Sequence, residues 1–156
     1  MRRPNKDVRR IMRDLLTPKS AIAAAAVLAA VGALAQAPAS VWDGVYTEGQ
    51  AARGVSLYRR ECASCHGEAL EGAGLFPSLA GDDFKSNWNG KPLGDLFEKM
   101  RATMPADHPG KLNRDQNADI LAYMLKQNGF PAGSTAIKGD ANALKSVRFD
   151  AAKPGK

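Results

Sequence analysis

The feature that most constrains this chain is the motif Cys62-Ala63-Ser64-Cys65-His66. Two thiols separated by two residues, with an imidazole directly after the second thiol, are the pattern of covalent c-type haem attachment. On one helical turn, both sulfurs can reach the two vinyl groups of one porphyrin as thioethers. His66 then lies where a ring nitrogen can bind the iron. The motif predicts one haem c, attached covalently through Cys62 and Cys65.

Two other kinds of site also use a pair of cysteines. A thioredoxin-like dithiol needs a βαβ context, and this sequence has almost no strand pattern. A zinc site would have to combine Cys62, Cys65 and His66 with His108, the only other histidine of the chain. Adjacent Cys65 and His66 are awkward ligands for one tetrahedral ion, and the gap to His108 matches no standard spacing. Haem attachment is therefore favoured over both alternatives.

Residues 1–37 have the pattern of a secretory signal. A basic segment precedes an apolar run from Ala21 to Ala35, and an A-x-A site ending at Ala37 predicts cleavage before Pro38. The alternative is a retained membrane anchor, although a helix over this run would span about 22 Å of the roughly 30 Å hydrocarbon core. The sequence predicts an exported, periplasmic protein, which is bound to a membrane only if the segment is retained.

The formal net charge of +6 comes mostly from this first segment. Residues 1–37 carry seven Lys/Arg and two Asp, which leaves 15 basic and 14 acidic residues in positions 38–156. A nearly neutral mature protein without a basic stripe argues against a nucleic-acid partner. The expected organisation is a signal peptide (1–37), a linker (38–46), a folded domain (47–136) and a C-terminal tail (137–156). The tail is expected to pack loosely through Leu144, Val147 and Phe149 or to be disordered.

Apolar residues at helical spacing and capping residues predict the main elements. The expected helices cover residues 48–61, 92–101 and 114–127. Thr47 is the predicted N-cap of the first helix, with Gln50 as its capping-box partner, and Asn113 is the predicted N-cap of the last. Gly54 interrupts the first helix at a cost of about 1 kcal/mol relative to alanine. Close approach of another helix, with the ring of Tyr123 in the space that the glycine leaves, would explain it; simple tolerance of the glycine is the alternative.

The glycine-rich stretch from Gly67 to Asp82 predicts an irregular loop. Pro77 holds this loop locally, and a backbone carbonyl there is expected to accept the second ring N–H of His66, which strengthens a metal-binding imidazole. An ordinary rigid turn is the alternative. Trp88 follows the loop, and its indole N–H needs a partner if it is buried. A haem propionate and plain core packing both remain open for Trp88.

Met104 is the predicted second iron ligand. Pro105 disfavours helical geometry at Met104, so the thioether is expected to project from an extended loop toward the iron. Met100 lies one helical turn earlier and Met124 lies in the last helix, so both are better explained as core residues. His108 would instead produce bis-histidine ligation with a lower potential.

These features together resemble the class I monohaem cytochromes c, over about residues 47–131. The resemblance rests on the CxxCH motif, the run from Phe76 to Leu79, Trp88, the Met104-Pro105 step, and Gly54 with Tyr123 on the terminal helices. It implies an all-α cytochrome c fold, with three to four short helices around one covalently bound haem and with crossed N- and C-terminal helices. A narrower likeness is to small periplasmic cytochromes that accompany quinoprotein dehydrogenases.

The resemblance also implies a role in single-electron transfer, with His66 and Met104 as axial ligands, rather than catalysis by the chain itself. The expected partners are redox proteins, a dehydrogenase as donor and an oxidase or another cytochrome as acceptor, met by a monomer. Two alternatives stay open. One is a haem enzyme or ligand sensor with a labile sixth iron position. The other is a cytochrome subunit of a membrane-associated dehydrogenase or oxidase.

Overall fold

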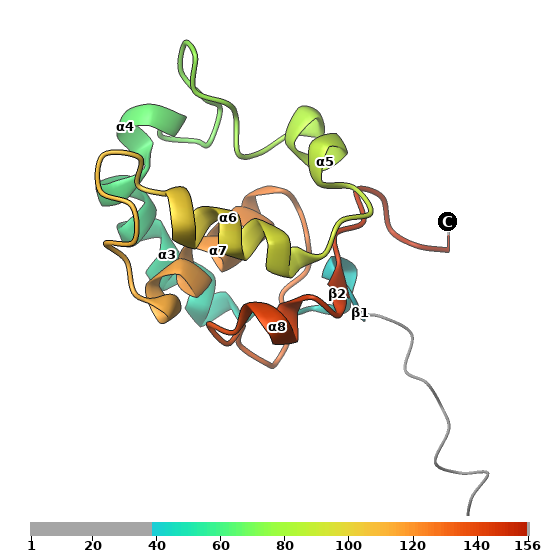
Figure 1. The fold of residues 1–156 in the computed structure, drawn as a ribbon. Helices are drawn as coiled ribbons and strands as arrows, with labels where there is room; N and C mark the ends of the chain where they lie inside the picture. Colours follow the sequence, from blue (N-terminus) through green and yellow to red (C-terminus); the bar gives the residue numbers. More distant parts are fainter. Residues whose placement is uncertain (1–38, 156) are drawn as a thin grey trace, which may run out of the picture. The chain divides into compact units, whose positions relative to one another are not determined.

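The computed structural model describes residues 39–155, which are almost entirely helical (Figure 1). The helices are α3 (Glu48–Glu61), α4 (Ala63–His66), α5 (Asp82–Trp88), α6 (Leu93–Thr103), α7 (Arg114–Gln127) and α8 (Ala141–Leu144). A 3-10 turn η1 (Val41–Asp43) and the short strands β1 (Ala39–Ser40) and β2 (Val147–Arg148) complete the described elements. The prediction of an all-α fold is confirmed. Helices α4 and α8 are single turns of 4 residues, and the longer helices form the body of the domain.

Helices α3 and α7 begin and end where capping chemistry predicts. The capping box of α7 is complete, because the side chain of Asn113 accepts from the Gln116 amide and Gln116 accepts from the Asn113 amide, both at 2.9 Å. Thr47 caps α3 by accepting from the Gln50 amide at 3.2 Å. The prediction that the Gln50 side chain completes a capping box with Thr47 is wrong. The side-chain amide of Gln50 bonds instead to both backbone groups of Ile137, at 2.8 and 2.9 Å.

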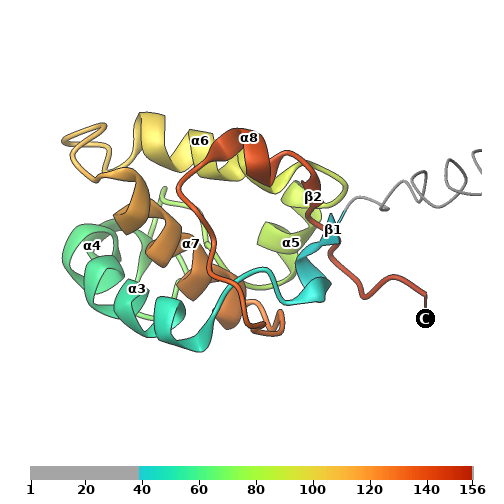
Figure 2. The ribbon, with the colours of Figure 1, turned by 90° about the horizontal axis from the view of Figure 1, so that it is seen from below.

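Helices α3 and α7 cross closely at Gly54, side by side in both ribbon views (Figures 1 and 2). A Cβ atom added to Gly54 would lie 2.0 Å from the carbonyl oxygen of Asp119 and 2.8 Å from Cβ of Tyr123. The prediction that another helix approaches closely at Gly54 is therefore confirmed, and that helix is the one that carries Tyr123. The ring of Tyr123 does not fill the space left by the glycine, however; the α7 backbone does. That ring packs against Tyr58, with the ring centroids 5.3 Å apart.

The C-terminal segment is part of the core, which corrects the prediction of a loose tail. Its buried residues are Ile137, Ala141, Leu144, Val147 and Phe149. Phe149 packs edge to face with Phe84 and Phe130, at centroid distances of 5.9 and 5.1 Å. Its backbone N–H donates to the carbonyl of Lys91 at 2.9 Å. The sequence signal was weak because these apolar residues are separated by small and charged residues, without a long helical period.

The segment predicted as a linker is also packed, because it pairs with this C-terminal segment. Strand β1 runs parallel to β2, with Ser40 in register with Arg148. The hydroxyl of Ser40 donates to the carboxylate of Asp150 at 2.6 Å, and the indole of Trp42 donates to the Asp150 carbonyl at 2.9 Å. The folded unit therefore begins before residue 47 and continues beyond residue 136.

The predicted signal peptide, residues 1–37, lies outside the described residues. Within residues 39–155, no helix has both the length and the apolar character needed to cross a membrane.

The crossing at Gly54 leads to a stability prediction with a control in the same helix. Gly54→Ala should lower the free energy of unfolding by about 2–4 kcal/mol, since its Cβ would meet main-chain atoms that cannot move alone. Gly49→Ala introduces the same residue where no atom lies within 4 Å. It should be neutral or stabilising by up to about 1 kcal/mol. Denaturant unfolding of the two purified variants measures both, and equal stabilities would contradict the crossing.

Candidate haem site

Cys62, Cys65 and His66 lie on one turn at the junction of α3 and α4. Cys62 ends α3 and begins α4, and its carbonyl accepts hydrogen bonds from the amides of Cys65 at 3.1 Å and His66 at 2.9 Å. Both thiols are free and half-buried. The structure therefore brings together the three residues that the motif singled out, with their backbone held in a single tight turn.

The ring of His66 is held in one orientation by the loop that follows it. Nδ1 of His66 lies 2.8 Å from the carbonyl oxygen of Pro77. A carbonyl only accepts hydrogen bonds, so Nδ1 donates and Nε2 of the neutral ring retains its lone pair. Nε2 has no partner among residues 39–155, yet no buried side-chain nitrogen or oxygen there lacks one, so Nε2 reaches open space. Metal-binding histidines typically have this tautomer, with the other ring nitrogen donating to a backbone carbonyl. These residues therefore fit a haem iron.

The loop from Gly67 to Gly81 is anchored to the helices at both ends. At its start, the buried hydroxyl of Tyr58 donates to the Gly67 carbonyl at 2.7 Å, and the Gly72 amide donates to the His66 carbonyl at 2.8 Å. Burial raises the pKa of Tyr58, so this hydroxyl stays protonated as a donor. The Pro77 carbonyl is therefore delivered to His66 by a loop of defined shape.

The far end of the loop is held by Asn128, which the sequence analysis did not single out. The side chain of Asn128 accepts from the Gly81 amide at 3.1 Å and donates to the Leu79 carbonyl at 3.0 Å. It also donates to the Met124 carbonyl of its own helix at 2.8 Å. The only sequence signal was an asparagine before Gly129, which is equally typical of a helix C-terminus without further function.

Met104 lies directly after α6, in the extended conformation that Pro105 favours (φ −123°, ψ 149°). Among the three methionines in the part of the chain that the structure describes, Met124 is buried in the core and Met100 packs against it. Met104 is half-buried and belongs to neither group. The side chain of His108 is 72% exposed, and its Nδ1 lies 3.1 Å from the Asp107 carboxylate. Met104 is thus the methionine whose position needs an explanation other than packing.

The segment after Met104 is tied to the end of α3 beside Cys62. The ammonium group of Lys111 lies 2.7 Å from the Glu61 carboxylate, which also accepts from Arg60 at 2.8 Å. These hydrogen bonds lower the pKa of Glu61. Both ribbon views place α4 and the loop that follows α6 at the same end of the domain (Figures 1 and 2). The two predicted ligand-bearing segments are therefore neighbours in the fold.

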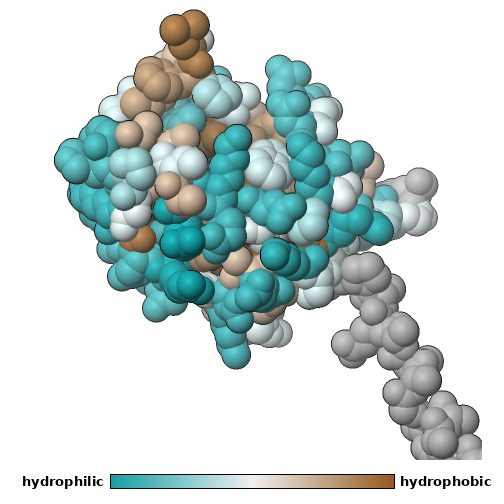
Figure 3. Space-filling model, in the orientation of Figure 1, coloured by the Kyte–Doolittle hydropathy of each residue, from teal (hydrophilic) through white to brown (hydrophobic). Residues whose placement is uncertain are grey.

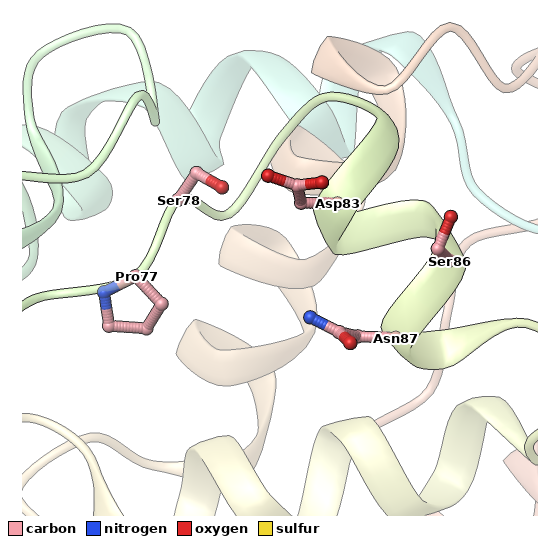
Figure 4. Close-up of a pocket in the computed structure, with 5 residues that line it drawn as sticks. All are labelled: Pro77, Ser78, Asp83, Ser86 and Asn87. Atoms are coloured by element: carbon pink, nitrogen blue, oxygen red, sulfur yellow. The ribbon is translucent and has the colours of Figure 1, made fainter.

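A hollow of about 380 Å³ lies between the loop and α5 (Figure 4). It is lined by Pro77, Ser78, Asp83, Ser86 and Asn87. The carboxylate of Asp83 and the amide of Asn87 are directed toward the loop (Figure 4). The volume is within the usual range of ligand sites, and the hollow begins at the residue whose carbonyl holds His66.

Trp88 does not line this hollow. Trp88 is half-buried, and its ring centroid lies 6.5 Å from that of Phe84. The ammonium group of Lys91 lies 5.3 Å from the Trp88 ring centroid. These contacts account for Trp88 as a packing residue at the end of α5, and its contact with haem stays a prediction.

The two other readings of the cysteine pair find no support in this geometry. Burial, with smaller contributions from Glu61 and Cys65, raises the pKa of the Cys62 thiol to about 11. Reactive dithiols have a lowered thiol pKa. Within residues 39–155, no cluster of three or more His, Cys, Asp or Glu side chains is arranged to hold a metal ion, and the distant His108 stays with Asp107.

Comparison with known proteins agrees with this site. Residues 49–124 match the family described as cytochrome C oxidase, cbb3-type, subunit III. Cytochrome c-554(547) of Halothiobacillus neapolitanus is 58% identical over 33 residues, which are 21% of this chain and 36% of that protein. The cbb3-type cytochrome c oxidase subunit CcoP of Azospirillum brasilense is 31% identical over 93 residues, 49% of this chain and 30% of the subunit. The chain thus spans about a third of the length of these relatives.

Among solved structures, the sulfane dehydrogenase SoxCD from Paracoccus pantotrophus matches with a TM-score of 0.49 and 22% identity, over 69% of this chain and 61% of that one. The site and the sequence matches are similar to those of c-type cytochrome domains, which suggests a role in electron transfer. Residues 49–124 thus resemble a c-type cytochrome domain, and the single CxxCH motif of the chain fits the class I monohaem form.

The anchoring of the loop by Asn128 can be tested directly. Asn128→Ala removes three side-chain hydrogen bonds and should cost about 2–4 kcal/mol of unfolding free energy. It should also remove hydrogen-exchange protection from the Gly81 amide, which donates to this side chain. The matched control is Asn142→Ala, an exposed residue whose side chain bonds to none of the described residues. Unchanged exchange at Gly81 in Asn128→Ala would contradict the anchoring role.

Proposed function

We propose that this chain is a single-electron carrier that attaches one haem c through Cys62 and Cys65 and binds its iron with His66 and Met104. The observation that carries the proposal is the 2.8 Å contact between Nδ1 of His66 and the Pro77 carbonyl, because it leaves Nε2 as a free lone-pair donor beside the two cysteines. Bound haem supplies reversible one-electron exchange at its iron.

The side chains of this domain suit a carrier better than an enzyme. His66 and Met104 would both bind the haem iron, which would leave no iron position for a substrate. A thioether ligand favours ferrous iron, so the potential should be higher than with two histidines. The Pro77 carbonyl keeps the His66 ring oriented, and the anchored loop holds that carbonyl in place. A domain that changes little between states exchanges electrons with little rearrangement.

One relative supports a place for this chain in a larger redox system. That relative is named as a subunit of a cbb3-type cytochrome c oxidase. We therefore propose redox proteins as partners of this chain, with a dehydrogenase such as a quinoprotein as donor and an oxidase or another cytochrome as acceptor. A carrier that moves between them as a monomer, and a subunit held in one complex, are both compatible with such partners.

The N-terminal sequence pattern supports a proposal of export to the periplasm with removal of residues 1–37. The mature protein isolated from its native host should then begin at Pro38 and gain the mass of one haem that denaturation does not release. Intact-protein mass spectrometry and N-terminal sequencing measure both. An intact N-terminus with bound haem would indicate a retained anchor, and a haem-free mature chain would refute the attachment.

The choice of Met104 as ligand leads to a second test. Met104→Ala should leave the haem attached but open the sixth position, so that the ferric protein binds imidazole or cyanide readily. The long-wavelength band of sulfur-ligated ferric haem should disappear, and the potential should fall by on the order of 0.1 V.

The control for this test is Met100→Ala, which removes the same side chain one turn earlier and should retain the band. If Met100→Ala loses the band and Met104→Ala retains it, the ligand assignment is wrong. If the wild-type ferric protein is already high-spin and binds cyanide rapidly, the alternative of a haem enzyme or ligand sensor is favoured instead.

A further inference from the structure

The loop between α4 and α5 presents two large apolar side chains to water at its outermost turn. Leu75 is 101% exposed and Phe76 is 48% exposed, and they are the two large exposed hydrophobic residues of the described chain. We call these two residues the apolar tip. The tip projects from the top of the domain in Figure 1, and Figure 3 shows a brown apolar protrusion there above a mostly hydrophilic face. Leaving the Leu75 side chain in water forgoes the free energy that its burial would release.

The tip is held in place by a tight turn. The amide of Phe76 donates to the Ala73 carbonyl at 2.9 Å, and the Ala73 amide donates to the Phe76 carbonyl at 3.2 Å. Gly74 occupies the first central position of this turn with φ +56°, a conformation that glycine adopts at little cost. The turn therefore holds Leu75 at its end, and the exposure of Leu75 follows from ordered backbone geometry.

The tip is also directly connected to the proposed haem site. The rings of Phe76 and His66 meet edge to face with their centroids 6.4 Å apart. Pro77, the next residue, provides the carbonyl that accepts from His66. A protein seated on the tip would therefore contact the segment that holds His66, which is where an electron-transfer partner benefits most from close approach.

The charges of the loop that carries the tip distinguish between possible occupants. The loop segment 67–77 carries two carboxylates, Glu68 and Glu71, and no Lys or Arg. Both are exposed, and neither forms an ion pair within residues 39–155. Glu71 is ordered by a 2.8 Å hydrogen bond from the Ala69 amide. This segment thus combines apolar side chains with a local negative charge.

We infer that the apolar tip, with Glu68 and Glu71, is the docking surface for a redox partner that offers an apolar hollow with a basic rim. The inference rests on the proposed electron-transfer function and names the surface that serves it. Leu75 enters the hollow of the partner, and the carboxylates pair with Lys or Arg at its edge. Such a small contact is typical of brief redox encounters.

The same features argue against two other occupants. An anionic membrane surface would repel Glu68 and Glu71, which lie on the same loop as the tip. A second copy joined tip to tip would bring the same carboxylates together, and two side chains bury too little area for a stable dimer.

The test uses haem-loaded protein and washed respiratory membranes of the host as the source of the acceptor. Leu75→Ser should lower the second-order rate constant for oxidation of the reduced protein by about tenfold or more. Its oxidation by ferricyanide and its potential should not change. Glu68→Lys should lower the rate by about threefold or more at low salt, with the difference lost at high salt. Asp115→Lys makes the same charge change outside the loop and should stay within about twofold of the wild type.

Several outcomes would overturn the inference. One is an equal rate for Leu75→Ser and wild type with the membranes while both react with ferricyanide. Others are vesicle binding, to phosphatidylcholine with or without phosphatidylglycerol, or self-association in sedimentation experiments, if Leu75→Ser abolishes it. The proposed electron-transfer function fails separately if the wild-type protein carries no haem or does not react with ferricyanide.

Discussion

The close contact of α3 and α7 at Gly54 is the constraint on which the rest of the domain depends. Because the Asp119 carbonyl occupies the place of a side chain, the two helices meet at backbone distance. The end of α3 carries Cys62, and the end of α7 carries Asn128. One packing contact therefore positions both the cysteine motif and the residue that anchors the loop facing it.

Hydrogen bonds connect helices α3 and α7 to the loop that holds His66. Asn128 and Tyr58 hold opposite ends of the loop, and the loop presents the Pro77 carbonyl to His66. No buried side-chain nitrogen or oxygen within residues 39–155 is left without a partner. Since an unsatisfied buried group would cost about 1–3 kcal/mol, a network without such a group favours one arrangement of the loop. One defined arrangement around His66 suits the electron-transfer role that we propose for this chain.

The C-terminal segment closes the domain by covering the side of the core near α5 and α6. Phe149 packs against Phe84 and Phe130, and β2 pairs with β1. The C-terminal residues thus form a second layer of packing, and they are far in sequence from the CxxCH motif. Within residues 39–155, the large exposed hydrophobic residues are instead Leu75 and Phe76, in the turn beside His66. Packing and partner contact are in this way assigned to different parts of the chain.

The sequence by itself determined the helix boundaries of α3 and α7, the single turn that carries Cys62, Cys65 and His66, and the extended backbone at Met104, because capping, motif spacing and proline sterics act over a few residues. The tertiary structure alone decided that Gln50 binds Ile137, that Asn128 anchors the loop and that the segment after residue 137 joins the core. These contacts join residues about 45–90 positions apart, and local patterns carry no information about which distant polar group or aromatic ring a side chain will meet once the helices have packed.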